Sequence, residues 1–152
     1  MELMDLKDPK QLKWLHQFII KFHSSPKWVL PSMGELDNPI FKYYQAVILK
    51  PDALSGKVLG ISSYEIRTHF LVETQKTIID PQYRGQGWGS VLSLEMENVV
   101  RRAGFKKIRT AIYSDNLPMI HIKLAQGFQI EGYHPDHDAP GLHEYSLGKV
   151  LK

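Results

Sequence analysis

The sequence predicts a mixed α/β fold in which helices cover both faces of one sheet. Three observations lead to this class. Strand patterns follow an N-terminal helical stripe, a glycine-spaced loop then runs into a long amphipathic helix, and strand and helix patterns alternate after it. With 152 residues and no internal repeat, the chain is expected to form a single domain over residues 1–152 that buries most of its apolar surface.

The N-terminal part is predicted to begin with a helix. Asp8 precedes Pro9 and an apolar stripe that ends near Ser24, so Asp8 is the expected N-cap and Pro9 the first helical residue. Residues 1–6 fit either an edge strand or a frayed terminus. The proline-rich stretch at residues 26–39 predicts a loop or a short broken helix.

Three strands are expected next. Strand patterns at residues 42–50 and 57–67 flank a turn and predict a hairpin. A third strand is predicted at 69–80, and Pro81 ends it because proline cannot donate a ladder hydrogen bond.

The C-terminal part alternates between strands and one short helix. A strand is predicted at residues 107–113, and Asn116 then caps a helix that stops at Gly127. Two closing strands, at 128–133 and 142–148, are joined by a loop rich in histidine and aspartate. Together these patterns give the mixed sheet stated above.

Composition narrows the function classes. The chain has no cysteine, which excludes disulfides, thiolate metal sites and a cysteine nucleophile. A net charge of +3, spread along the chain, disfavours nucleic-acid binding and suits an anionic cofactor. No stretch resembles a signal peptide, and the apolar runs are far shorter than the roughly 18 residues of a membrane span. We therefore expect a cytoplasmic protein with no nucleic-acid or membrane partner.

The glycine-spaced loop at residues 84–90 leads directly into a helix with one apolar stripe. Unpaired N–H groups collect at a helix start, the helix dipole adds partial positive charge, and glycines let the backbone approach a bulky anion. Arg84 adds a cation, Ser90 adds a hydroxyl, and Gly104 closes the helix. The loop is therefore predicted to bind phosphate.

Spacing separates the phosphate-binding loops. The Walker pattern requires a lysine after its second glycine, and no lysine follows the glycines here. Counted from Gly85 and Gly87, the dinucleotide pattern needs a third glycine where Ser90 stands, and no clear acidic residue ends a second strand about 20 residues on. Both patterns are disfavoured, and nucleotide or dinucleotide binding remains only a lower-ranked alternative.

The stretch resembles motif A of the GNAT superfamily of acyl-CoA-dependent N-acetyltransferases. Arg84, Gly87 and Gly89 fill its Gln/Arg-x-x-Gly-x-Gly/Ala pattern, and residues 116–128 resemble the second signature of the family, an Asn-capped helix that ends in Gly-Phe. The resemblance covers about residues 42–149. It implies a GNAT-like, mostly antiparallel sheet with a central, splayed pair of parallel strands, and acetyl-CoA as co-substrate.

The resemblance also implies which residues hold the cofactor. The N–H groups of Ile78 and Ile79 would bind the acyl carbonyl and the pantetheine arm. Toward the carbonyl oxygen they would act as the donors of an oxyanion hole. Asn116, from the second signature, is included among the cofactor-binding residues. The loop that would hold the pyrophosphate consists of Arg84, Gly85, Gln86, Gly87, Trp88, Gly89 and Ser90.

Two residues are candidates for proton transfer. Glu73 would deprotonate the amine, because it lies on the strand before motif A and shares strand parity with Ile79; a solvated strand carboxylate is the structural alternative, and His69 a weaker candidate. Lys123 stands where the family usually has a tyrosine near the leaving sulfur, so lysine would be the general acid or would contact phosphate. Other candidate acids, each also explained by a structural role, are Tyr113, Tyr133 and Tyr145, and a mechanism with no protein acid is open as well.

The histidine- and aspartate-rich loop could suggest a metal site. Its spacing follows no known site, and prolines interrupt it, so no metal is expected. In the family, this loop borders the acceptor site, and we expect His134 to His143 to contact substrate.

These observations predict an N-acetyltransferase that transfers an acetyl group from acetyl-CoA to a primary amine by direct attack in a ternary complex. The departure at Lys123 supports the alternative, a catalytically silent acyl-CoA-binding module. The acceptor remains open among small amines, antibiotics, peptide N-termini and protein lysines. A homodimer is equally open.

Overall fold

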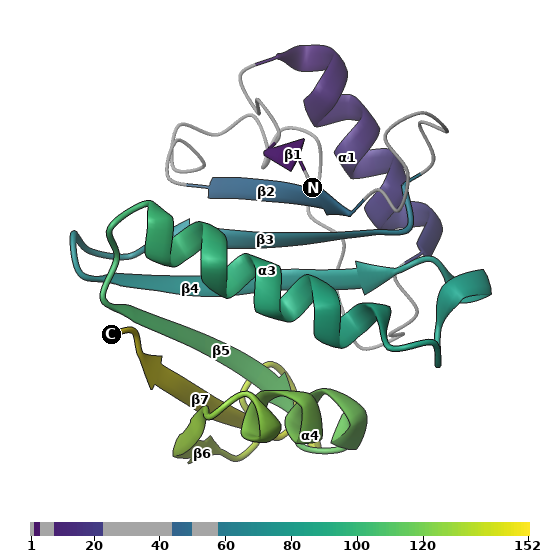
Figure 1. Cartoon of the computed structure of the whole chain (residues 1–152). Helices are drawn as coiled ribbons and strands as arrows, with labels where there is room; N and C mark the ends of the chain where they lie inside the picture. Colours follow the sequence, from purple (N-terminus) through teal and green to yellow (C-terminus); the bar gives the residue numbers. More distant parts are fainter. Residues whose placement is uncertain (1, 4–7, 23–43, 50–57) are drawn as a thin grey trace.

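The computed structural model describes residues 2–3, 8–22, 44–49 and 58–152 (Figure 1). It contains one seven-stranded sheet with the strand order β1-β2-β3-β4-β5-β7-β6. The mixed α/β class predicted from the sequence is confirmed. None of the helices in these ranges is long and apolar enough to cross a membrane.

The first helix, α1, spans Pro9–Phe22. Asp8 caps it as predicted, because its Oδ1 accepts the N–H of Lys10 at 2.9 Å. The short strand β1 (Glu2–Leu3) pairs with β2 (Tyr44–Leu49) at the sheet edge, which decides between the two alternatives for this segment.

The predicted hairpin is present as an antiparallel pair of β2 with β3 (Gly60–Ile66). Its turn, and the proline-rich stretch at 26–39, lie outside the described residues.

The centre of the sheet contains the predicted parallel pair. Strand β4 (Leu71–Ile79) pairs with β5 (Lys107–Tyr113) only from Leu71 opposite Lys107 to Thr74 opposite Thr110. Beyond that point both strands continue without pairing to each other. The two strands therefore splay apart at their carboxyl ends, as the family resemblance implied (Figure 1).

A β-bulge interrupts β4 before the splayed end. Ser62 of β3 lies opposite Thr77, whereas Tyr64 lies opposite Thr74, so two residues of β3 correspond to three of β4. The extra residue reverses the alternation of side chains. The expectation that Glu73 shares a face with Ile79 is therefore wrong. Counting alternate residues along the sequence assumes a regular strand, and a bulge cannot be seen in that count.

Helices cover both faces of the sheet. Helix α3 (Trp88–Arg102) follows a short 3₁₀ turn, η2 (Pro81–Tyr83), and packs on β3 and β4, while α1 contacts β4 from the other face (Figure 1). Helix α4 (Leu117–Ala125) follows β5. The closing strands, β6 (Gln129–His134) and β7 (Glu144–Val150), pair antiparallel, and β7 joins β5.

The two helices of the second half end in the same way. Gly104 (φ 91°) donates its N–H to the carbonyl of Arg101, and Phe105 donates to Val100, which is the Schellman arrangement. Gly127 (φ 84°) repeats it at the end of α4, followed by Phe128. A Gly-Phe pair thus ends each helix and turns the chain toward the core.

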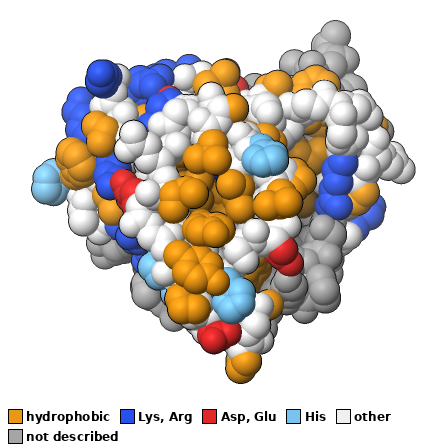
Figure 2. Space-filling model, turned by 90° about the horizontal axis from the view of Figure 1, so that it is seen from below, with side chains coloured by type: hydrophobic (Ala, Val, Ile, Leu, Met, Phe, Trp, Pro, Cys, Tyr) orange, Lys and Arg blue, Asp and Glu red, His pale blue; other side chains and the backbone are white. Residues whose placement is uncertain are grey.

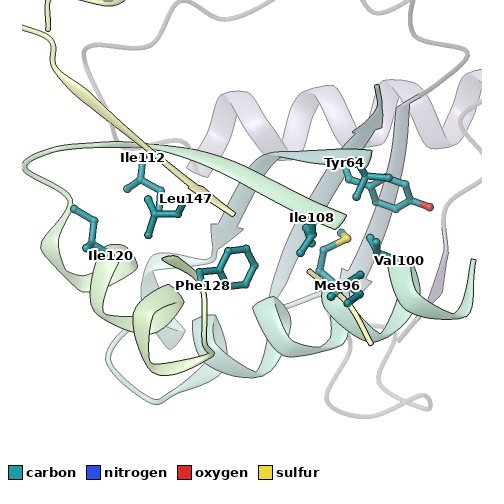
Figure 3. Close-up of a cluster of buried hydrophobic side chains, with 10 residues drawn as sticks. Tyr64, Met96, Val100, Ile108, Ile112, Ile120, Phe128 and Leu147 are labelled. Carbon is teal, nitrogen blue, oxygen red and sulfur yellow. The ribbon is translucent and has the colours of Figure 1, made fainter. Parts of the chain in front are cut away.

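The main core lies between α3, α4 and the sheet (Figure 3). Figure 2 shows hydrophobic side chains that also gather on the surface, on the side of the molecule that carries α4, β6 and β7. Large exposed hydrophobic side chains on these elements are Leu117, Leu124, Ile130, Tyr133 and Val150. The buried residues of the main core are Tyr64, Val72, Met96, Val100, Ile108, Ile112, Ile120, Phe128, Leu147 and Leu151.

Candidate active site

A cavity of about 340 Å³ lies where β4 and β5 diverge. Its walls come from β4, β5, the start and inner face of α4, and the segment between β6 and β7. Four of the predicted site residues line it: Glu73, Ile78, Asn116 and Lys123. The splay thus forms a walled space at the point where the two strands separate.

The glycine loop forms the other part of the site, at the N-terminus of α3. Gly85 (φ 73°) and Gly87 (φ 85°) have left-handed backbones, which glycine adopts without strain. Gly87 is also the N-cap of α3. Arg84 donates from Nε to the carbonyl of Ile79 at 3.0 Å, so the arginine links the loop to the end of β4.

The loop presents a run of backbone donors. In the described ranges, no backbone acceptor lies within hydrogen-bond distance of the N–H groups of residues 85–89. These amides stand at the positive end of the α3 dipole, and a Cβ added at Gly85 or Gly87 would meet no other atom within 4 Å. An open cradle of this kind fits a pyrophosphate.

Side chains of the loop have other uses. Trp88 is half-buried and packs against Leu59 and Leu92, so its indole belongs to the core and only its backbone faces the loop. Gln86 donates from Nε2 to the carbonyl of Gln82 at 3.2 Å, which keeps this side chain on the loop itself.

Backbone direction distinguishes the two isoleucines predicted to hold the acyl group. Asp80 donates its N–H to the carbonyl of Leu59, on the β3 side. Because N–H groups alternate in direction along a strand, the N–H of Ile78 also points to β3, and that of Ile79 points into the gap. The carbonyl of Ile79 points away from β3 too, since it accepts from Arg84. This geometry favours Ile79 over Ile78 as a donor.

Asn116 has a structural contact as well as a place in the cavity wall. Its Oδ1 accepts the N–H of Met119 at 3.4 Å, which confirms the predicted N-cap of α4. The side chain therefore fixes the helix that carries Lys123 into the cavity.

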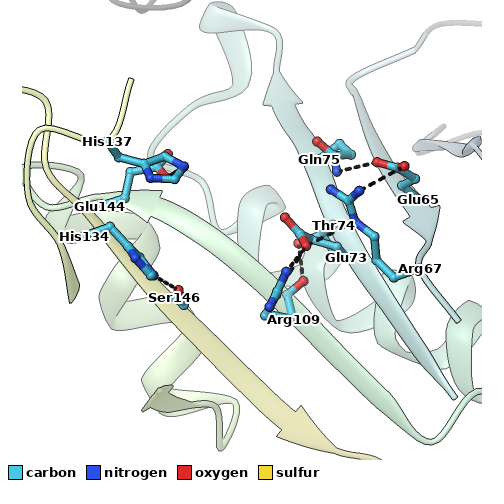
Figure 4. Close-up of polar contacts among 10 residues, drawn as sticks. All are labelled: Glu65, Arg67, Glu73, Thr74, Gln75, Arg109, His134, His137, Glu144 and Ser146. Atoms are coloured by element: carbon cyan, nitrogen blue, oxygen red, sulfur yellow. Dashed lines mark hydrogen bonds and ion pairs between the residues drawn. The ribbon is translucent and has the colours of Figure 1, made fainter. Parts of the chain in front are cut away.

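Glu73 lies on the cavity wall between two arginines (Figure 4). Its Oε2 accepts from Nε of Arg109 at 3.2 Å and from Nε of Arg67 at 3.3 Å. Its Oε1 makes no hydrogen bond to the part of the chain that the structure describes. One oxygen is thus held in place and the other is open. His69, the weaker candidate, lies in the exposed turn before β4 and not on the strand or the cavity wall.

Sequence reasoning missed Arg109. The sheet register sets it directly opposite Glu73 in the parallel pair. No local pattern joins residues 36 positions apart, so only the pairing of β4 with β5 could have identified this contact.

Lys123 is 2 % exposed and lines the cavity from α4. Its Nζ donates to Oγ of Ser93 at 2.7 Å and lies 4.6 Å from the centre of the Phe128 ring. Burial lowers the pKa of the lysine to about 8, with a further lowering by Lys149 and an opposing effect of Glu97. Near neutral pH this lysine therefore exchanges protons more readily than a surface lysine.

The tyrosines named as other acids are placed less well. Tyr113 lines the cavity, but burial and its hydrogen bond to Asp138, 2.6 Å from its hydroxyl, raise its pKa above the ordinary value. Tyr133 is half exposed, and its ring stacks with Tyr145 at 5.2 Å between centroids; neither is among the cavity-lining residues.

The histidine-rich loop borders the cavity, as expected for the family. His137, Asp138 and Glu144 line it, and Nε2 of His137 lies 3.5 Å from Glu144 (Figure 4). His134 contacts Ser146 instead, and Nδ1 of His143 accepts the N–H of Asp136. Among the described residues, no group of three potential ligands could hold a metal ion.

Comparison of the sequence with family models places the chain among the acyltransferases. The sequence model of the acetyltransferase (GNAT) family matches residues 14–128. The chain belongs to this family, and its enzyme class is that of the N-acetyltransferases.

Solved structures share the fold at low identity. The ribosomal-protein-S18-alanine N-acetyltransferase of Escherichia coli has a TM-score of 0.78 and 15 % identity, over 99 % of this chain and 94 % of that one. YncA of Salmonella typhimurium, solved with its cofactor acetyl-CoA, has a TM-score of 0.74 and 17 % identity, over 99 % of this chain and 92 % of that one. Spermidine/spermine N-acetyltransferase of Vibrio cholerae has a TM-score of 0.75 and 16 % identity, over 98 % of this chain and 91 % of that one. Comparison with curated proteins found no match.

Proposed function

We propose that this chain, acting as a single domain, transfers the acetyl group of acetyl-CoA to a primary amine by direct attack in a ternary complex. The observation that carries the proposal is the open end of the β4–β5 pair beside a helix N-terminus, where the amides of residues 85–89 make no backbone hydrogen bond within the described part of the chain. An acyl-CoA needs both features, because its pyrophosphate is anionic and its acyl arm is thin and extended.

The loop residues from Arg84 to Ser90 would bind the pyrophosphate through their backbone. Arg84 would add charge while it remains bonded to Ile79. The N–H of Ile79 would donate to the thioester carbonyl as that oxygen gains charge, with Ile78 supporting the strand and Asn116 holding α4. Acetyl-CoA supplies a thioester carbon that an amine can attack.

Proton transfer completes the reaction. The amine nitrogen forms a bond to the carbonyl carbon, the carbon–sulfur bond breaks, and sulfur leaves with the electron pair. Glu73 would accept the proton that the amine loses, at its open Oε1. Lys123 would supply the proton that the thiolate gains, and its lowered pKa suits that task near neutral pH.

The acceptor is proposed as an amine that carries positive charge. Carboxylates from three elements line the cavity: Glu73, Asp138 and Glu144. Two neighbours by fold are named for acceptors of different size, a ribosomal-protein alanine and spermidine or spermine. Both kinds of amine belong in the first panel of acceptors.

Calorimetric titration of CoA and acetyl-CoA tests the cofactor step. Wild-type protein should bind with micromolar affinity, and Gly87→Asp should lose binding because a carboxylate would stand where the pyrophosphate lies. Gly104→Asp is the matched control: its backbone is also left-handed, and its Cβ also meets nothing within 4 Å, but it lies at the other end of α3. No binding to the wild type, or equal loss in both variants, would refute the proposal.

Thiol release from acetyl-CoA with the amine panel tests the chemical step. Turnover with an amine supports the transferase. Cofactor binding without turnover on any amine would favour a catalytically silent acyl-CoA-binding module, the second candidate. The observation that favours this candidate is Lys123 at the position of the family tyrosine, hydrogen-bonded to Ser93.

A further inference from the structure

Lys123 belongs to a chain of hydrogen bonds that links it to the start of α3. The chain runs from Nζ of Lys123 to Oγ of Ser93 at 2.7 Å, from Ser93 to Oε1 of Gln126 at 2.7 Å, and from Nε2 of Gln126 to the carbonyl of Ser90 at 3.0 Å. Ser93 is 1 % exposed and Lys123 is 2 % exposed. The chain is therefore buried where it meets the lysine.

The direction of each bond follows from its far end. The carbonyl of Ser90 can only accept, so the amide nitrogen of Gln126 must face it. The amide oxygen then faces Ser93 and takes its single hydroxyl proton. Ser93 consequently has only lone pairs to offer, and Lys123 must be the donor in the last bond.

This direction holds whether the lysine is charged or neutral. A charged Lys123 has three N–H bonds and a neutral one has two, and one of them stays on Ser93 in both cases. The proton that Lys123 gains or loses cannot pass through Ser93, whose own proton is committed to Gln126. It must leave on another side of the nitrogen, and the cavity is the space that Lys123 lines.

The other charged groups around Lys123 do not change the direction of its hydrogen bond to Ser93. Glu97 is on α3, as Ser93 is, but its carboxylate is bonded to Lys149 at 2.8 Å and to Arg101 at 2.6 Å. Lys149 of β7 also donates to the carbonyl of Gln126. Across the cavity, the charged or titratable groups in the wall are Glu73, Tyr113, His137, Asp138 and Glu144.

We propose that Ser93 and Gln126 are positioning residues that direct the exchangeable proton of Lys123 into the cavity. The direction of the hydrogen bonds is independent of the reaction. The identity of the proton acceptor, the leaving thiolate of CoA, rests on the proposed function.

Titration of Lys123 by NMR tests the proposal without any need for turnover. Protein with ¹³C-labelled lysine gives a Cε signal for each lysine, and Lys123→Met identifies the signal of interest. In Ser93→Ala the ammonium loses its acceptor, and a bond from a charged donor is stronger than one from a neutral donor. The apparent pKa of Lys123 should therefore fall by about one unit. Ser93→Thr keeps the hydroxyl and should restore the wild-type value.

A matched control separates this effect from a general loss of packing. Ser62→Ala also removes a buried hydroxyl, one that bonds Thr77 at 2.9 Å. Thr77 lines the same cavity, but in the described residues neither Ser62 nor Thr77 is hydrogen-bonded to Lys123. It should leave the titration of Lys123 unchanged. An unchanged titration in Ser93→Ala, or the same shift in Ser62→Ala, would overturn the proposal.

Gln126→Ala provides a second variant if Ser93→Ala does not fold. Gln126 is only half-buried, and its loss frees the Ser93 proton to donate to neutral Lys123, so the pKa should again fall. No fall would overturn the proposal. With an active amine, both variants should lower kcat and shift its pH profile, and Ser93→Ala, which makes no bond to the cofactor loop, should leave the KM for acetyl-CoA unchanged. Shifted titrations without turnover would refute the transferase and keep the positioning role of Ser93 and Gln126.

Discussion

Thr74 and Thr110 are the last residues that pair β4 with β5. Up to this pair the two strands form an ordinary parallel ladder, and beyond it they no longer pair with each other, although β4 stays paired with β3 and β5 with β7. Both threonines are buried and line the cavity that opens there. The site is therefore a feature of strand pairing, and its side chains modify a space that the backbone creates.

Glu73→Gln should reduce kcat by about a hundredfold or more, because an amide cannot accept the amine proton. The affinity for CoA should not change, since Glu73 is on β4 before the splayed end. Glu65→Gln is the control: Glu65 bonds Arg67 and Gln75 on the same face but is not among the cavity-lining residues. Steady-state kinetics with a saturating amine measure the effect. Equal losses in both variants would assign Glu73 to the surface ion-pair network alone.

Lys123 should make stability depend on pH in an unusual direction. Its pKa is about 8 in the folded protein and 10.5 as the ordinary value, so the unfolded chain holds more protons between these values. The free energy of unfolding should therefore rise from about pH 8 to 10.5. Over this range the unfolded state loses the lysine proton, and with it the advantage it has over the folded state, which disfavours the charged lysine. Below pH 8 the full penalty applies, on the order of 3 kcal/mol.

Lys123→Met removes this titration. Urea unfolding at pH 7 and at pH 9.5 should show the variant to be more stable than the wild type at pH 7, with a smaller difference at pH 9.5. Only the difference between the two proteins is informative, because other groups titrate in both. A difference that does not change with pH would contradict the buried, titrating lysine.

Phe128→Ala should cost about 3–4 kcal/mol of unfolding free energy, because a large ring is removed from a packed core. The ring is 3 % exposed and lies beneath Nζ of Lys123. Phe70→Ala is the control, since Phe70 is 43 % exposed and should cost far less. Thermal or urea unfolding measures both. Similar losses would show that the end of α4 is not packed as described.

Tyr113→Phe should raise the KM of the amine several-fold and leave CoA affinity unchanged. The hydroxyl of Tyr113 anchors the loop between β6 and β7 by donating to Asp138 at 2.6 Å, and such a bond to a charged acceptor contributes about 1.5–3 kcal/mol. Because the pKa of Tyr113 is raised above 10, the effect should be constant from pH 6 to pH 9. Tyr133→Phe, at a half-exposed position, is the control. A change in CoA affinity instead would mean that the loop serves the cofactor.

Local rules allowed much of the fold to be predicted. Asp8 and Asn116 cap their helices, and Gly104 and Gly127 end theirs, because each depends only on residues within one or two turns. The pattern that predicted the glycine loop likewise depends only on neighbouring residues. These signals located the helices and, through the family resemblance, the central parallel pair of strands.

Features that depend on distant pairing could not be predicted. The bulge in β4 arises from its register with β3, and it reversed the expected face of Glu73 relative to Ile79. The contact between Glu73 and Arg109 needs the parallel register of β4 and β5. The hydrogen-bond partner of Lys123, Ser93, comes from α3, thirty residues earlier, so sequence position alone could identify the lysine but not this contact.

Beyond Thr74, β4 is paired with β3 on one side only, so its other side is a sheet edge that faces β5 without pairing to it. Exposed edges invite an extended partner that can complete the ladder, and proteins normally cover them. An acyl-pantetheine arm, which carries amides, is such a partner. The N–H of Ile79 should then exchange with solvent deuterium slowly when CoA is bound and quickly when it is not, so that one amide reports whether the sheet is complete.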